Sequence, residues 1–440
     1  MEIFVRVAQL LLSLSLLVII HEFGHFMFAK LFKCRVEKFY LFFDPYFSIF
    51  KKKIGETEYG IGWLPLGGYV KISGMIDESM DKEQMKQEPQ PWEFRSKPAW
   101  QRLLVMIGGV LNNVILACVI YTAMSYVWGE SYLPNDNVKY GVQTTEISKE
   151  VGIHDGDKII SIDGTKIDRF SQINQFILLE DAQKLTVKRD GELVTLDIPS
   201  NTIAKLISSK TSFVYPRRPF DGTIDAFAKN SAARNAGLDL EDKIISVDNN
   251  RFQYIDQVQS YFKENAGKDV VVEFNHDGQE KESMLKVNDK GFIGVQFSSY
   301  DFELATIHYS FFESIPRGME RGKNSIVNYL KQLKLMGNPD TGAYKSVGGF
   351  ISIGKIFPTY WDWYSFWNMT ALLSIILAVM NILPIPALDG GHVLFLLFEI
   401  ITRRKPNEKF LEYAQTAGMF ILLALLLYAN GNDIIKLIFN

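Results

Sequence analysis

The stretch His21-Glu22-Phe23-Gly24-His25 lies inside a run, from Ile3 to Phe32, that is otherwise almost entirely apolar. A charged side chain near the middle of a bilayer costs about 2.5 kcal/mol or more, so such groups need partners. On a helix the two histidines, spaced i and i+4, lie on one face, and Glu22 borders that face. This is the spacing of two zinc-binding imidazoles and a general base. The alternative, a polar pair joining two membrane helices by a hydrogen bond, explains neither the spacing nor the glutamate.

Length, charge and cysteine content limit the class of protein. The chain has 440 residues, enough for two to four domains, and a net charge of −3, which argues against a nucleic-acid partner. Its two cysteines, Cys34 and Cys118, lie in or beside apolar runs, which favours buried thiols over a disulfide framework. Residues 1–20 lack a basic leader and a small-residue cleavage site, so we expect a retained membrane span.

Four apolar segments are long enough to cross a bilayer, which takes about 20 residues. They begin near residues 3, 100, 364 and 410. The third is interrupted by NILPIPALDGGH at 381–392, where two prolines and two glycines break the helix and leave backbone groups in need of partners. Asp389 is a lone carboxylate in this segment and needs a partner too. We interpret the fourth segment as a packing helix.

A glycine-rich stretch, GIGWLPLGGYVKISG at 60–74, separates the first two spans. Its glycines and alternating residues indicate a bent β-hairpin, and its apolar content suggests that the hairpin dips into the membrane. Such backbone is tolerated there only against protein or a wet cavity. A soluble hairpin is the alternative. A later stretch, 301–343, has the spacing of an amphipathic helix that lies on the membrane or on the soluble part.

The region between the second and third spans contains a repeat. GIHDGDKIISID at 152–163 matches GLDLEDKIISVD at 237–248, 85 residues later. A strand entered through a Gly–acidic turn and left through another turn resembles PDZ domains, so we predict two in tandem, joined by a linker at 199–219. Such domains bind extended peptides or chain ends by strand addition. Spacers without a peptide ligand are the alternative.

Loop charges predict the orientation of the spans. Lys and Arg cluster in the loop 33–98 and at 403–409, which places both loops inside and the repeat region outside. The first and third spans then run in the same direction. Phe23 lies ten residues before Lys33 and Asp389 fourteen before Arg403, or roughly 15 and 21 Å from the inner boundary. Asp389 is therefore available at the right depth as a third zinc ligand, and three protein ligands with one open position define a catalytic site.

Together these motifs resemble the site-2 protease family of intramembrane zinc proteases. The resemblance is based on two motifs, His21-Glu22-x-x-His25 in one span and Asn381-x-x-Pro384-x-Pro386-x-Leu388-Asp389-Gly390 in another. The tandem insert is similar to that of the bacterial RseP-type branch. The resemblance implies a polytopic α-helical membrane protein with four transmembrane helices, a membrane-associated β-hairpin and two extracytoplasmic PDZ-like α+β domains.

The resemblance also implies roles for individual residues. His21, His25 and Asp389 would bind Zn²⁺, and Glu22 would be the base. The second-span motif, usually Gly-Pro-x-x-Asn, here reads GGVLN at 108–112, with glycine in place of proline, which leaves the role of its asparagine open. The predicted substrate-binding residues are Asn112, Asn381, Gly68, Tyr69, Val70 and Lys71. For His392, which could be mistaken for a further ligand, we favour a packing or supporting role.

The implied setting is the bacterial inner membrane, and the implied activity is hydrolysis of peptide bonds within transmembrane segments. Expected partners are membrane lipids and single-pass membrane proteins, such as anti-sigma factors or remnant signal peptides, that an upstream site-1 protease has trimmed. A non-catalytic PDZ-bearing receptor with structural zinc is the main alternative, although a structural site needs no base. A metal transporter would need several polar spans. The expected segments are 1–34, 35–98, 99–130, 135–200, 215–299, 300–345, 364–402 and 410–430.

Overall fold

The computed structural model describes residues 2–75, 88–405 and 407–439. The chain forms two compact units, which are treated separately below. The helical unit comprises residues 1–130, 307–337 and 344–440, and the β-rich unit comprises residues 131–306 and 338–343.

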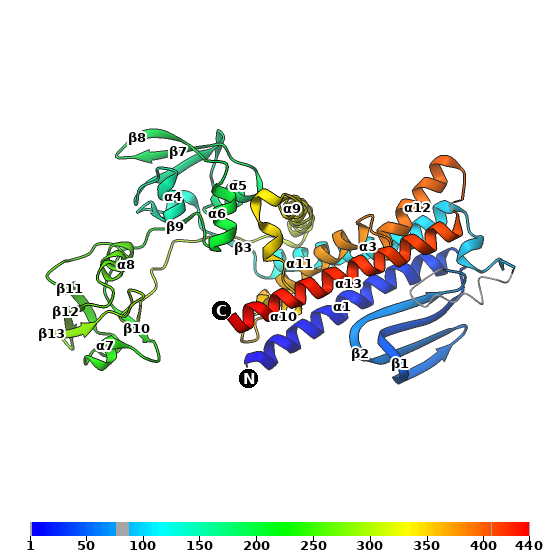
Figure 1. Cartoon of the computed structure of the whole chain (residues 1–440), viewed down its shortest axis with the longest axis horizontal. Coiled ribbons are helices and arrows are strands. Elements are labelled where there is room, and N and C mark those ends of the chain that lie inside the picture. The colour runs from blue at the N-terminus through cyan, green and yellow to red at the C-terminus, as the bar shows by residue number, and fades with distance from the viewer. Residues whose placement is uncertain (1, 76–87, 406, 440) are drawn as a thin grey trace. The chain divides into compact units, whose positions relative to one another are not determined.

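Four helices of the helical unit are long and apolar enough to span a membrane (Figure 1). They are α1 (Glu2–Leu31), α3 (Ala99–Val127), α11 (Trp363–Ile382) and α13 (Glu408–Phe439). After α11 the chain breaks at the predicted prolines and resumes as α12 (Asp389–Thr402). The chain is thus a multi-pass membrane protein, and its four long helices with several small antiparallel sheets confirm the predicted fold class.

Glycines bring α1 and α3 into close contact. A Cβ on Gly24 would lie 2.1 Å from the carbonyl oxygen of Gly108, and a Cβ on Gly108 would lie 2.6 Å from that of Gly24. Any larger residue at either position would push the helices apart, because the obstacle is backbone. Small residues at helix crossings are typical of membrane proteins, where close van der Waals packing drives association. This crossing directs the histidine face of α1 toward α3.

The glycine-rich stretch forms part of a long, bent hairpin of β1 (Val36–Ile54) and β2 (Thr57–Ile72). Residues 36–41 of β1 pair on one side with 58–61 and on the other with 68–72, through several register shifts. The segment 68–72 is therefore an edge within this sheet. Gly68 touches α1, since a Cβ there would lie 2.8 Å from a Val18 methyl carbon. The membrane placement of the hairpin remains a prediction.

Further helices of this unit are α9 (Phe311–Gly337) and α10 (Phe350–Ile356). The helix α9 lies within the predicted amphipathic stretch and packs on α3 through glycines: Gly318 adjoins Thr122 and Gly322 adjoins Cys118. The thiols of Cys34 and Cys118 are both free, as expected. Among the 3-10 helices of the described residues, η1 (Phe94–Ser96) lies in this unit, η2 (Asn135–Asn137) and η3 (Pro339–Thr341) lie in the β-rich unit, and η4 (Ala343–Ser346) lies at the boundary in sequence.

The β-rich unit contains two separate hydrophobic cores. The first is enclosed by the sheets β6-β5-β7-β8 and β4-β9 and the second by β11-β12-β13 and β10-β14. Elements around the first core are β4 (Val142–Thr144), α4 (Glu146–Glu150), β5 (Lys158–Ile162), β6 (Thr165–Lys166), α5 (Ser171–Leu179), β7 (Lys184–Arg189), β8 (Glu192–Asp197), α6 (Thr202–Ser209) and β9 (Val214–Pro216). Elements around the second are β10 (Ile224–Phe227), α7 (Ala232–Asn235), β11 (Lys243–Val247), α8 (Ile255–Glu264), β12 (Asp269–His276), β13 (Gln279–Lys286) and β14 (Val295–Phe297).

The repeated sequence forms equivalent structures in the two halves. In the first, Asp157 accepts the backbone N–H of His154, and in the second Asp242 accepts that of Asp239. Strands β5 and β11 follow at equivalent positions. The insert also begins and ends at one place, because β3 (Glu130–Tyr132) pairs with β15 (Ala305–Ile307).

The stretch 199–219, read from the sequence as a linker, contributes to the first core. Leu206 on α6 is buried there with Phe213 and Val214, and β9 pairs with β4. The structure thus extends the first core to Pro216, beyond the repeat match that located it.

We predict that Arg189→Met destabilises the first core. The Asp157 carboxylate is 2 % exposed and accepts bonds of 2.9 and 2.7 Å from Arg189. Burial opposes ionisation of Asp157, but the bonds from Arg189 and His154 outweigh it and hold the pKa of Asp157 below its usual value. Removing one partner of such a pair costs about 3 kcal/mol.

Amide hydrogen exchange in β5 and β7 of the full-length protein measures this loss, with Lys188→Met as the matched surface control. Because the folded-state pKa is lowered, the stabilisation is present above the unfolded pKa of about 3.9 and disappears as the pH falls through the folded value. The difference between wild type and variant should therefore shrink below about pH 4. Equal exchange in Arg189→Met and Lys188→Met at neutral pH would contradict the role of the ion pair.

Candidate metal centre

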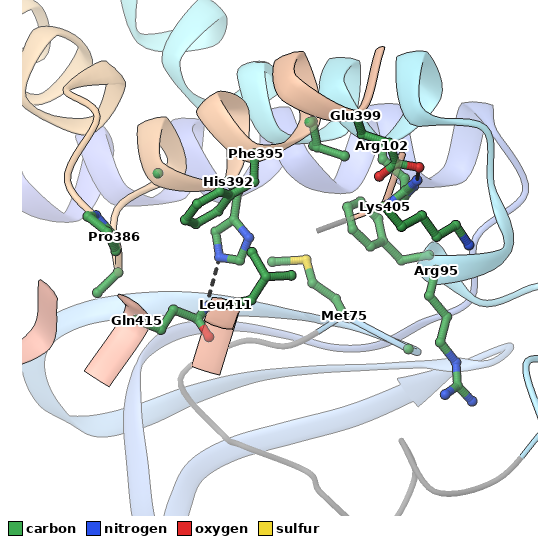
Figure 2. Close-up of a pocket in the computed structure, with 15 residues that line it drawn as sticks. Met75, Arg95, Arg102, Pro386, His392, Phe395, Glu399, Lys405, Leu411 and Gln415 are labelled. Atoms are coloured by element: carbon green, nitrogen blue, oxygen red, sulfur yellow. Dashed lines mark hydrogen bonds and ion pairs between the residues drawn. The ribbon is translucent and has the colours of Figure 1, made fainter. Parts of the chain in front are cut away.

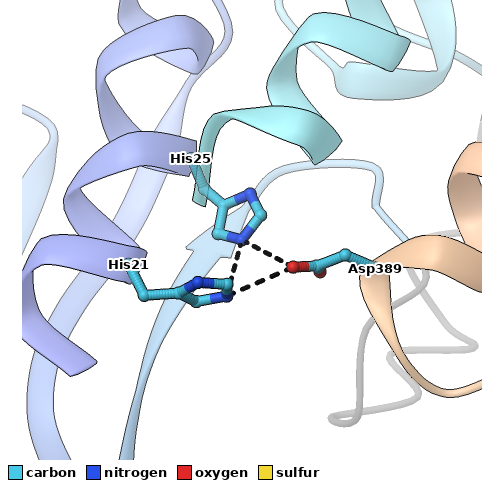
Figure 3. A group of neighbouring side chains, drawn as sticks. All are labelled: His21, His25 and Asp389. Atoms are coloured by element: carbon cyan, nitrogen blue, oxygen red, sulfur yellow. Dashed lines mark hydrogen bonds and ion pairs between the residues drawn. The ribbon is translucent and has the colours of Figure 1, made fainter. Parts of the chain in front are cut away.

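Three side chains from two apolar segments converge within the helical unit (Figure 3). The Nε2 atoms of His21 and His25 lie 3.3 Å apart, and each faces Oδ2 of Asp389, at 3.2 and 3.3 Å respectively. Both imidazoles are buried, and the carboxylate is largely shielded. Within the described residues this is the one group of three that could hold a metal ion.

The donor separations match those of a tetrahedral zinc site. Two ligands on bonds of ~2.0 Å at a tetrahedral angle lie about 3.3 Å apart. In addition, Oδ2 of Asp389 is buried and accepts no hydrogen bond within the described residues. An orphaned carboxylate oxygen facing two ring nitrogens is costly without a cation among them. The three residues therefore fit Zn²⁺ as three of its four ligands.

The second ring nitrogen of each histidine has its own partner. His25 Nδ1 lies 2.8 Å from the carbonyl oxygen of Val105 and must donate to it. Donation from Nδ1 leaves the Nε2 lone pair directed at the metal position, the usual arrangement of a ligating histidine. The carbonyl of Val105, on α3, thereby fixes both the tautomer and the ring orientation of His25.

His21 has an equivalent support in Asn113 of α3. The Asn113 amide lies 3.2 Å from His21 Nδ1, and Asn113 itself is fully buried. In this orientation the amide nitrogen of Asn113 faces the ring, and its Oδ1 has no hydrogen-bond partner within the described residues. The two ends of an amide have nearly the same shape, so Oδ1 can face the ring and accept the Nδ1–H proton. That orientation satisfies Oδ1 and frees His21 Nε2 for the metal.

Gly109 forms the wall of the site on α3. A Cβ there would lie 2.5 Å from His25 Nε2 and 2.7 Å from His21 Cε1, which are the metal-facing parts of the rings. Gly109 and Asn113 are spaced i and i+4, so one face of α3 supplies both the space and the hydrogen bond. Gly109 stands in the motif 108–112 but was not predicted as a site residue, and neither was Asn113. The sequence signal for Asn113 is its place beside Asn112, since two adjacent amides inside a span are expected to face protein.

The loop between α11 and α12 places Asp389 at the first position of α12. The loop folds tightly over this helix start: a Cβ on Gly390 would lie 2.1 Å from the Leu383 carbonyl oxygen, and one on Gly391 2.7 Å from that of Ile385. Ala387 takes a φ of 81°, which is rare for a residue with a side chain. Glycines at 390–391 and a strained Ala387 thus allow the prolines to turn the chain back toward the histidines.

Glu22 and the hairpin meet beside this cluster. The half-buried Glu22 side chain lies beside the backbone of Val70, on the edge segment of β2. The predicted base therefore contacts the strand for which substrate pairing was predicted, residues Gly68, Tyr69, Val70 and Lys71.

The predicted asparagines occupy different places. The amide of Asn381, at the end of α11, lies 3.3 Å from His21 Nε2 and so borders the metal position. Asn112 is half-buried, and its neighbour Asn113 is the one that contacts His21. His392 is not part of the metal group and lies 3.0 Å from the amide of Gln415 on α13, and its supporting role stays a prediction.

Comparison with known proteins gives matches along the whole chain. The model of the family described as Peptidase family M50 matches residues 9–425. "Regulator of sigma E protease" of Haemophilus influenzae is 27 % identical, with 97 % of this chain and 98 % of that protein covered. "Putative zinc metalloprotease" of Borreliella burgdorferi is 30 % identical, covering 96 % of each chain. A protein of the same name from Vibrio cholerae is 28 % identical, covering 97 % of this chain and 98 % of its own.

We predict that Gly109→Ala empties the metal centre. The added methyl group would displace both imidazoles, and disturbances of this kind cost about 10- to 100-fold in metal affinity. Zinc content of the purified full-length protein, measured by atomic spectrometry after dialysis, should fall accordingly. The control is Gly431→Ala, a glycine on a spanning helix where a Cβ meets nothing within 4 Å. Equal zinc content in the two variants would show that Gly109 does not shape the site.

Proposed function

Because this chain belongs to peptidase family M50 and is a zinc metalloprotease, we propose that it hydrolyses peptide bonds within transmembrane segments of single-pass membrane proteins. The observation that carries the proposal is the meeting of His21, His25 and Asp389 between apolar helices. A metal site placed there serves a substrate that is itself in the membrane. The proposed ligands are these three side chains.

The proposed chemistry assigns the proton transfers to Glu22. Zinc, when bound, supplies the Lewis-acid chemistry that lets water attack near neutral pH. Glu22 takes a proton from the attacking water and returns it to the amine of the cleaved bond. Glu22 lies beside the backbone of Val70, on the edge segment that we assign to the substrate. Val105 and Asn113 hold the imidazoles in place throughout.

A helical substrate hides its carbonyl groups in its own hydrogen bonds and must unwind before it is cut. We assign the unwound segment to the edge segment of β2, at Gly68, Tyr69, Val70 and Lys71, by strand addition. Asn381 borders the metal position and is suited to hold the substrate backbone. Asn112 stays in the proposal as a weaker contact, because its neighbour Asn113 faces His21.

In the β-rich unit, a cleft of about 390 Å³ lies between α8 and the end of β14, lined by polar side chains that include Arg218, Gln259 and Gln296. A cleft between a strand and a helix suits an extended peptide. The equivalent strand of the first core, β9, is less suited: the Phe213 N–H donates to Asn174, and Pro216 has no N–H. We therefore assign peptide binding to the second domain and a spacer role to the first.

The proposed setting is the bacterial inner membrane, with the tandem domains outside and the loops rich in Lys and Arg inside. A relative carries the name "Regulator of sigma E protease". Anti-sigma factors and remnant signal peptides are accordingly the proposed substrate types. An upstream site-1 protease would first remove their extracytoplasmic parts, and the tandem domains would hold back untrimmed proteins.

We predict that Glu22→Gln abolishes cleavage of a single-pass membrane reporter by the purified protein. Loss of a general base lowers kcat by about 100-fold or more. The zinc content should remain at the wild-type level, because the glutamate is not a proposed ligand. Glu2→Gln, at the start of the same helix, is the matched control and should retain activity. Cleavage by Glu22→Gln at the rate of Glu2→Gln would remove Glu22 from the mechanism.

We predict that removing residues 135–299 permits cutting of untrimmed substrates. The ends of the insert meet at Ser131 and Thr306, whose hydroxyl oxygens lie 2.8 Å apart, so a short glycine linker can close the gap. The measurement compares long and trimmed reporters in wild type and deletion variant. Retained zinc and retained cutting of the trimmed reporter show that the variant is folded. An unchanged preference for the trimmed reporter would argue against a size filter.

A further inference from the structure

The helical unit contains a cavity of about 180 Å³ that none of the three metal ligands lines (Figure 2). Its walls come from α12 and the loop before it, from the starts of α3 and α13, and from residues 74–75 and 94–95. At one end lie Pro386, His392 and Gln415, and at the other lie cationic side chains (Figure 2). Between these ends the lining is hydrocarbon, with Met75, Phe395, Leu396 and Leu411.

The cationic end carries Arg95, Arg102 and Lys405. Arg95 is paired with Glu93 at 2.6 Å, so it adds no net charge to the mouth. Arg102 donates a bond of 2.6 Å to Glu399, and both side chains are largely shielded. Lys405 is exposed, and no carboxylate of the described residues lies within ion-pair distance of it. Because Arg95 and Arg102 each have a carboxylate partner, the excess positive charge of the mouth comes from Lys405, which is available to an anion.

This mouth lies at the ends of the membrane-spanning helices. Arg102 is in the first turn of α3, Arg95 is in η1 just before that helix, and Lys405 is in the turn between α12 and α13. The hydrocarbon part runs along α12 and α13 toward the interior of the span. An apolar slot that opens among cations at a helix boundary has the polarity of a lipid molecule, with its headgroup at the surface and its chain inside.

We propose that this cavity binds an anionic phospholipid, with the phosphate at Lys405 and Arg102 and one acyl chain between α12 and α13. A peptide strand is a poorer occupant, because each of its residues brings a backbone N–H and C=O that need partners. The hydrocarbon lining offers few such partners, whereas an acyl chain requires none. The proposal concerns a site separate from the peptidase chemistry.

The test is native mass spectrometry of the full-length protein in detergent, with added phosphatidylglycerol or phosphatidylcholine. Lys405→Gln should weaken retention of phosphatidylglycerol by about 5-fold, the effect of one cation near a membrane surface. The matched control is Lys409→Gln, which removes a cation from the same region but not from the cavity. Phosphatidylcholine should be retained weakly by all three proteins.

A second variant, Leu411→Trp, tests the chain-binding half by filling the slot and leaving the cations in place. It should lose phosphatidylglycerol but not zinc, and added glycerol phosphate should not displace the lipid. Equal retention by Lys405→Gln and Lys409→Gln would overturn the proposal. So would displacement by glycerol phosphate, which indicates a soluble phosphate site. A raised KM for a membrane reporter in Lys405→Gln with unchanged lipid retention would overturn it too, by assigning the cavity to the substrate.

Discussion

The structure depends on burying two imidazoles and a carboxylate between apolar helices, which is tolerable only when the three groups satisfy one another through a cation. His21, His25 and Asp389 meet this condition at separations of 3.2 to 3.3 Å. The close approach of the helices requires positions without a side chain. Glycines accordingly stand where α1 crosses α3, where α3 faces the rings and where α12 begins. The glycine pattern of the spans is thus a consequence of the metal site.

The sequence predicts the proposed metal ligands better than the residues that hold the two imidazoles in place. His21 and His25 follow from helical periodicity alone, and Asp389 follows from its isolation in an apolar run at a matching depth. The choice between Asn112 and Asn113 depends on the rotation of α3 about its axis. That rotation is set by the crossing of Gly24 and Gly108, a contact between helices far apart in sequence. No local pattern specifies it, so the supporting amide could not be assigned to one residue.

The first core of the β-rich unit shows the same limit of prediction from sequence. Local periodicity located β5 and β11 through the repeat, whereas α6 and β9 offered no repeat and few apolar residues. Phe213 and Val214 are nevertheless buried, because β9 completes a pair with β4, about seventy residues earlier. Pairing between distant strands is decided by the whole fold, and a short strand with a proline gives little signal by itself.

The contact between Glu22 and Val70 joins two features that the sequence presents separately. The base is fixed by α1, and the proposed substrate edge is fixed by the pairing of 68–72 with 36–41, which includes several register shifts. In the proposed mechanism, a substrate strand that pairs with this edge takes its register from the same backbone that lies beside the Glu22 carboxylate. The alignment of a scissile bond with the base then follows from one strand. Because strand pairing contacts the backbone, this alignment is compatible with substrates of varied sequence.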